Sequence, residues 1–179
     1  MTTLELLPPP TDPLMGGVPV ERDAVLSECG SYRFELTRVW SPALALLHWL
    51  MLNPSTADKR RDDATVRRCV KYAMRWGFGG IVIRNLFALR ATSPAVLRTH
   101  HDPVGAGNDG WIVTDPQRVM TIAAWGVNGT YLGRDRVVRR QLADAGIRLW
   151  HLGLNAGGQP AHPLQRRTTP AEPIEWAAV

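Results

Sequence analysis

The pattern of hydrophobic positions alternates between short apolar runs and amphipathic segments along the middle of the chain. Residues 32–39 alternate in period two, which is typical of a half-exposed strand. Continuous apolar runs follow at residues 44–52, 80–87, 118–125 and 147–150, and such runs predict strands that are buried on both faces. Amphipathic segments separate these runs, so we expect parallel pairing with right-handed crossovers.

The segments between the runs carry helix start and stop signals. Asp62 and Asp63 precede a helical pattern that ends at Gly77. Further helices are expected over residues 93–97, 108–113 and 134–145. The predicted fold class is therefore α/β, a three-layer α/β/α arrangement with about four parallel central strands and an N-terminal antiparallel edge strand.

Composition places this fold in one domain. Residues 1–20 are rich in proline and predict a flexible arm, which leaves residues 21–179 as a single α/β domain with enough apolar content for one core. The two cysteines lie far apart in sequence, which is typical of free thiols in a reducing compartment. We find no membrane-spanning run and no secretion signal, so we expect a cytoplasmic monomer.

The charge is basic, with 21 Lys and Arg against 16 Asp and Glu and a formal net charge of +5. Only Lys59 and Lys71 are lysines, and arginine suits contacts to phosphates and bases. A GC-rich genome gives the same excess of arginine. The balance is therefore compatible with a nucleic-acid partner without showing one.

Polar residues follow each buried run at the point where the predicted strand ends. Asn53 and Ser55 end the first run, Asn85 closes the second, Trp125 ends the third, and His162 comes after the fourth. Ligands of open α/β sheets bind at the carboxyl ends of the strands, so we expect these side chains to share one crevice. Amides can hydrogen-bond a base edge or hold a water, and a histidine can donate to a developing anion.

Four motifs identify a known family at this point. They are Met51–Asp58, the pair Asp62-Asp63, Arg84–Ala88 and His162–Leu164, and together they resemble a bacterial and phage family known as domain of unknown function 1643. At longer range, Asn53-Pro54, Asn85 and His162-Pro163 are similar, in chain order, to the motifs of the uracil-DNA glycosylase superfamily. Met51 stands where the first of those motifs has a glycine, and Leu164 stands where the last has a serine. These two departures disfavour a uracil-specific enzyme.

The resemblance implies a role for several of the candidate residues. Asn53 would hold the attacking water, and His162 would stabilise the departing base. The resemblance supplies no base, but Asp58 or Asp63 can take this role because a carboxylate accepts a proton that an amide does not. Capping is the alternative for the aspartates, and His151 is the rival histidine. The residues predicted to bind substrate are Pro54, Ser55, Arg60, Arg61, Asn85, Phe87 and Trp125.

These roles predict a diverged DNA-glycosylase-like protein that recognises a nucleobase in DNA and can hydrolyse an N-glycosidic bond. The alternatives are a non-catalytic nucleotide- or nucleic-acid-binding module and a transferase that acts on modified DNA bases. None of these readings needs a metal or another cofactor. The partner would be DNA or a nucleotide.

Overall fold

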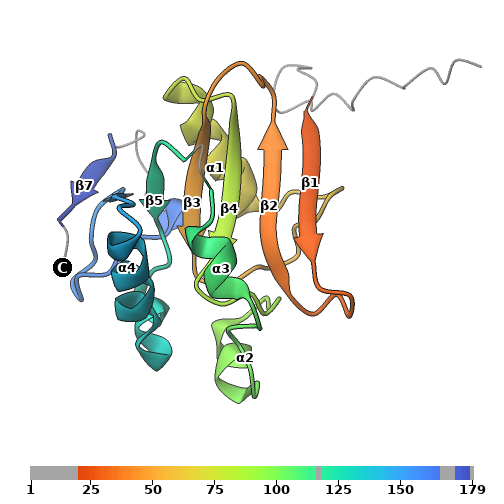
Figure 1. Ribbon diagram of the computed structural model, residues 1–179, viewed down its shortest axis with the longest axis vertical. Coiled ribbons are helices and arrows are strands. Elements are labelled where there is room, and N and C mark those ends of the chain that lie inside the picture. Colours follow the sequence, from red (N-terminus) through yellow and green to blue (C-terminus); the bar gives the residue numbers. More distant parts are fainter. Residues whose placement is uncertain (1–19, 116–117, 166–171, 178–179) are drawn as a thin grey trace, which may run out of the picture.

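The computed structural model describes residues 20–115, 118–165 and 172–177, and a seven-stranded mixed sheet forms its centre (Figure 1). The strand order is β1-β2-β4-β3-β5-β6-β7. The strands are β1 (Glu21–Leu26), β2 (Arg33–Val39), β3 (Leu46–Met51), β4 (Gly80–Asn85), β5 (Thr121–Ala123), β6 (Leu149–His151) and β7 (Ile174–Trp176). The four central strands β4, β3, β5 and β6 pair in parallel, and the remaining pairings are antiparallel.

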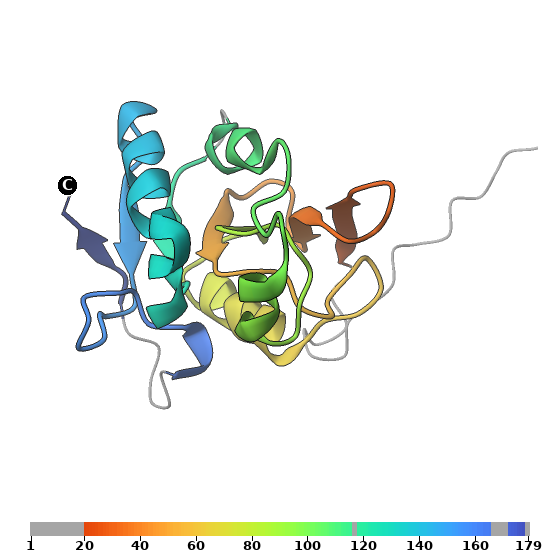
Figure 2. The same cartoon turned by 90° about the horizontal axis from the view of Figure 1, so that it is seen from below.

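Helices cover both faces of this sheet (Figures 1 and 2). Helix α1 (Ala64–Arg75) lies on one face, and α3 (Asn108–Val113) and α4 (Arg134–Asp144) lie on the other. Helix α2 (Pro94–Thr99) lies beyond the carboxyl end of β4. Two 3₁₀ segments, η2 (Val127–Gly133) and η3 (Pro163–Gln165), complete the described elements.

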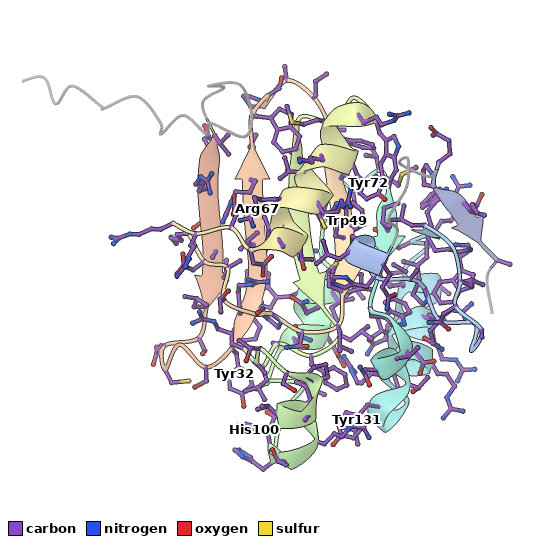
Figure 3. All side chains as sticks on the ribbon, turned by 180° about the vertical axis from the view of Figure 1, so that it is seen from behind. Tyr32, Trp49, Arg67, Tyr72, His100 and Tyr131 are labelled. Atoms are coloured by element: carbon purple, nitrogen blue, oxygen red, sulfur yellow. The ribbon has the colours of Figure 1, made fainter. Side chains whose placement is uncertain are left out.

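The alternation of side chains along β3 builds a separate core on each face. Trp49 packs against Tyr72 of α1, with 5.9 Å between ring centroids, and Figure 3 shows the two side chains together beside that helix. Leu50 belongs to the opposite cluster, together with Val138 and Leu142 of α4. Because β3 is buried on both faces, its carboxyl end is held rigidly between the two layers.

The structure confirms a mixed α/β architecture and changes the edges of the predicted sheet. The predicted edge strand, residues 32–39, is second from the edge because β1 pairs outside it. Strand β7 closes the other edge, where no strand was predicted. Strand β5 has three residues, fewer than the predicted run 118–125.

Strand β2 contains an irregularity that matters for the site. Val25 of β1 pairs with Glu35, but the next residue, Leu26, pairs with Arg33, so Phe34 is an extra residue. A bulge of this kind re-aims the side chains beyond it. Glu35 contacts Arg84 on the α3 face, with 2.7 Å between Oε2 and Nη2, whereas Arg33 reaches the α1 face.

Two expectations about the whole chain meet the structure only in part. The predicted arm, residues 1–20, lies outside the described residues except for Val20, which is fully buried. Within the described residues, no helix is both long enough and apolar enough to cross a membrane.

Candidate functional site

A pocket of about 420 Å³ opens at the carboxyl ends of the parallel strands, on the side of the α1 N-terminus. Segments distant in sequence form its walls: the ends of β3 and β4, the first turn of α1, the loop before α2, the start of η2, and η3. The polar residues of its lining are Arg33, Asn53, Ser55, Asp63, Thr65, Asn85, Thr92, Asn128, His162 and Gln165. This volume is in the range of small-molecule sites.

The pocket brings together six of the side chains that the sequence analysis predicted for the site. Asn53, Asp63, Asn85 and His162 all line it, and so do Ser55 and Trp125. They come from five different segments, so their convergence is a property of the fold and not of sequence proximity.

Asn85 occupies the floor of the pocket. It is the last residue of β4, it is 1 % exposed, and its Oδ1 has no hydrogen-bond partner among the described residues. Asn108 fixes this strand end by donating from Nδ2 to the carbonyls of Asn85 (3.0 Å) and Leu86 (3.2 Å). A rigidly held buried acceptor without a partner is expected where a ligand supplies the missing donor.

Asn53 is oriented by the backbone around it. Its Nδ2 donates to the carbonyls of Pro54 (3.0 Å) and Ala91 (2.8 Å). Because both acceptors require a donor, they fix the amide orientation and leave Oδ1 as the remaining polar atom. Asn53 can therefore offer the pocket an acceptor, such as a water molecule needs.

Asp63 is the N-cap of α1. Its Oδ1 accepts the backbone N–H of Val66 at 2.9 Å, so the predicted capping role is real. Asp63 also belongs to the pocket lining. Asp63 can therefore cap helix α1 and also be a candidate base in the pocket.

His162 precedes η3 and faces the same pocket. Its Nδ1 accepts the backbone N–H of Leu164 at 3.2 Å. Burial lowers the pKa of His162, and the nearby Asp63 carboxylate opposes that shift. A neutral imidazole whose Nδ1 is an acceptor carries its proton on Nε2, so His162 can donate a hydrogen bond to a ligand.

Trp125 is held at the pocket edge by a chain of hydrogen bonds. Its Nε1 donates to Gln159 Oε1 at 2.8 Å, and Gln159 Nε2 donates to Asp135 Oδ2 at 2.9 Å. The indole also lies 5.5 Å from the ring of Trp176. These contacts fix the ring, and Trp125 is only 2 % exposed.

The other nominated residues lie outside the lining. Asp58 Oδ1 accepts the backbone N–H groups of Arg60 (2.8 Å) and Arg61 (3.0 Å), which lowers the pKa of Asp58, and both arginines are exposed. Phe87 is fully buried against Tyr131, so it cannot stack on a ligand in this conformation. Pro54 contributes only its carbonyl, to Asn53 and Ala91.

The rival histidine, His151, is also outside the lining. Its Nδ1 accepts the backbone N–H of Gly153 at 2.9 Å, and its ring meets Trp176 edge-on. The structure thus favours His162 over His151 as the histidine of the pocket.

The sequence analysis missed Arg33, the buried cation of the lining, and also the polar lining residues Thr65, Thr92, Asn128 and Gln165. Arg33 is 3 % exposed, its Nη1 donates to Ala57 O at 2.7 Å, and its Nε has no partner among the described residues. Desolvation lowers the pKa of Arg33 to about 10, so the side chain is still a cation at neutral pH. In the sequence, Arg33 stands at a regular polar position of the alternating pattern over residues 32–39, so no signal set it apart.

The fold and the pocket define an α/β protein with a polar pocket at the carboxyl edge of its parallel strands. A family model described as protein of unknown function DUF1643 matches residues 33–164, and the chain belongs to this family. No curated protein and no solved structure matched the chain. The matched range contains every pocket residue discussed above except Gln165.

Proposed function

We propose that the pocket binds a nucleobase, in DNA as the sequence resemblance implies, and that the protein hydrolyses the N-glycosidic bond of the bound nucleotide. The observation that carries this proposal is the convergence of Asn53, Asp63, Asn85 and His162 on one pocket. Their free atoms are an acceptor at Asn85, an acceptor at Asn53 and a donor at His162. Recognition of a base and hydrolysis of its glycosidic bond call for hydrogen-bond acceptors and a donor of these kinds.

In the proposed reaction the target nucleotide is turned out of the helix into the pocket. Asn85 reads the base edge through its amide, with Oδ1 accepting an N–H of the base. The base then lies on the pocket floor, and the sugar lies near the less buried Asn53, Asp63 and His162.

Hydrolysis follows from the groups around the sugar. Asn53 Oδ1 accepts a hydrogen bond from a water, and the Asp63 carboxylate takes a proton from it as it attacks C1′. The C1′–N bond breaks, and its electron pair leaves with the base. His162 Nε2–H gives a hydrogen bond to the base anion and keeps its proton. The base anion then takes up the equivalent of the proton held on Asp63, and the products are a free base and an abasic sugar.

A test substitutes His162 with Asn in a base-release assay. Asn at this position can still accept the N–H of Leu164 but has no donor in place of Nε2. We expect release of free base from DNA with modified bases, measured by mass spectrometry, to fall about 100-fold, as for loss of one donor to a developing anion. The matched control is His101→Asn, because His101 is exposed and lies outside the pocket.

The second candidate is a binding module that does not turn over. Met51 lines the pocket at the position where the glycosylase motif has a glycine, and its bulk restricts the approach of a sugar. Saturable DNA or nucleotide binding without any released base, in the wild type and in His162→Asn alike, would select this candidate and overturn the hydrolase proposal.

A further inference from the structure

Four arginines are buried among the described residues, and Arg33 differs from the other three in its partner. Arg38 pairs with Asp62 at 2.7 Å, Arg84 with Glu35 at 2.7 Å, and Arg134 with Asp109 at 2.6 Å. Arg33 has no carboxylate within 4.0 Å among the described residues. A buried cation without a counter-ion is costly, so its retention in a pocket calls for an explanation.

The position of Arg33 is fixed by the fold. Its backbone N–H donates to Ala88 O at 2.9 Å, and its Nη1 donates to Ala57 O at 2.7 Å. The guanidinium therefore cannot move away to find a carboxylate elsewhere. Its Nε has no partner, and the side chain lines the pocket, so unused donors of a planar fork are held at the pocket wall.

The charges of Asp63 and Asp58 favour the Arg33 cation from a distance, but no described carboxylate forms an ion pair with it. Asp63 is the nearest carboxylate on the same wall, but its Oδ1 is turned toward the N–H of Val66 at the start of α1. Ala64 and Thr65 also line the pocket, and first-turn N–H groups have no intrahelical acceptor. The 12-residue helix α1 thus adds positive potential beside Arg33.

We propose that Arg33 is the subsite for a phosphate group of the bound nucleotide, so that the pocket recognises a base and a phosphate together. The planar fork of arginine matches two phosphate oxygens, and the first turn of α1 favours the same anion. This inference rests on the proposed nucleobase function. The phosphate can come from a free nucleoside monophosphate or from the strand of a nucleic acid.

The first test compares ligands with and without the phosphate. We expect calorimetric titration to show that deoxynucleoside 5′-monophosphates bind about tenfold tighter than the matching deoxynucleosides, as for one added charge-assisted contact. Arg33→Gln should abolish that preference, so that this variant binds a monophosphate no tighter than the matching nucleoside. Arg75→Gln is the control, because it removes the same charge from the exposed last turn of α1. A preference that persists in Arg33→Gln overturns the subsite.

The second test separates the two sources of phosphate. In a DNA ligand, one methylphosphonate at a time replaces the phosphates beside the target nucleotide. If the strand supplies the group, one replacement should weaken binding to the wild type about tenfold and have no effect on Arg33→Gln. If only the monophosphates show the preference, the source is a free nucleotide. If no phosphate source depends on Arg33, the subsite is wrong.

A third measurement keeps the subsite distinguishable from the proposed function. The Nε–H resonance of Arg33 in ¹⁵N spectra reports directly on the fork, with inorganic phosphate and a deoxynucleoside as separate probes. A shift with phosphate but no nucleoside binding supports the subsite and overturns the nucleobase proposal. Nucleoside binding without any response of Arg33 to phosphate supports the nucleobase proposal and overturns the subsite. Folding of each variant is checked by its unfolding midpoint.

Discussion

At the scale of single residues, Asn85 carries the clearest sign of function, because it is a buried acceptor that nothing in the described chain satisfies. Such an atom costs about 1–3 kcal/mol. We therefore expect Asn85→Leu to leave the free energy of unfolding unchanged or to raise it by up to that amount. Nucleobase binding should fall at least about tenfold, since a hydrogen-bonding floor becomes apolar.

Urea unfolding and calorimetric titration of the same variant measure both effects. Asn108→Leu is the matched control, because Asn108 donates to two backbone carbonyls and its loss should destabilise the fold. Equal destabilisation by the two substitutions would assign Asn85 a structural role and contradict the prediction.

The pocket residues that could be read from the sequence are those that end buried strands. Asn53 and Asn85 interrupt apolar runs, and this contrast is visible without a structure. Arg33 could not be found in this way, because a one-residue bulge in β2 reverses the face it would otherwise occupy. The choice between His151 and His162 also depended on the fold, since both follow the last parallel strand.

At the scale of elements, helix α1 offers a direct test of Asp63. We expect Asp63→Ala to lower the free energy of unfolding by about 1 kcal/mol through loss of the N-cap, whereas Asp63→Asn should retain most of the stability. Both variants should lose base release, because neither has a carboxylate. Comparing the two variants therefore separates the effect of Asp63 on helix stability from its effect on base release. Full activity in Asp63→Asn would show that Asp63 only caps the helix.

Helices were predicted better than strands because their ends carry local signals. Asp63 caps α1 as expected, Ser93 caps α2 at the start of its predicted range, and α3 has its predicted bounds. Strands β1 and β7 were missed, because an edge strand has one exposed side and needs no continuous apolar run. Backbone pairing with β2 and β6 defines them, and that pairing is not encoded locally.

At the scale of the whole molecule, the parallel pairing was predicted but the strand order was not. Strand β3 lies between β4 and β5, so the loops after these three strands meet at one edge, which Figure 2 views from below. The segment that follows β6 and leads into η3 then brings His162 to the same pocket as the first turn of α1. Sequence spacing could nominate these loops, but only the order of the strands shows which of them share a pocket.

The stability of the whole fold should depend on pH through His48, in the middle of β3. Burial and then the charge of Arg118 lower the pKa of His48, and its Nε2 lies 3.2 Å from Asp115 while Nδ1 has no partner. The unfolded chain therefore binds a proton near the ordinary pKa of 6.5, which the folded chain resists. The free energy of unfolding should fall below that pH by up to about 1.4 kcal/mol per pH unit.

His48→Gln checks this expectation, because a glutamine amide can donate to Asp115 in place of Nε2 but does not titrate. Urea unfolding between pH 6.5 and about pH 4.5 should show a smaller slope in His48→Gln than in the wild type. His162 adds a slope of the same sign, since burial also lowers its pKa, so a part of the dependence should remain. The aspartates with lowered pKa, such as Asp58, lose their contribution only below about pH 5, so the upper part of this window reports the histidines. Identical slopes in the wild type and in His48→Gln would mean that the folded protein accepts a proton on His48 without cost.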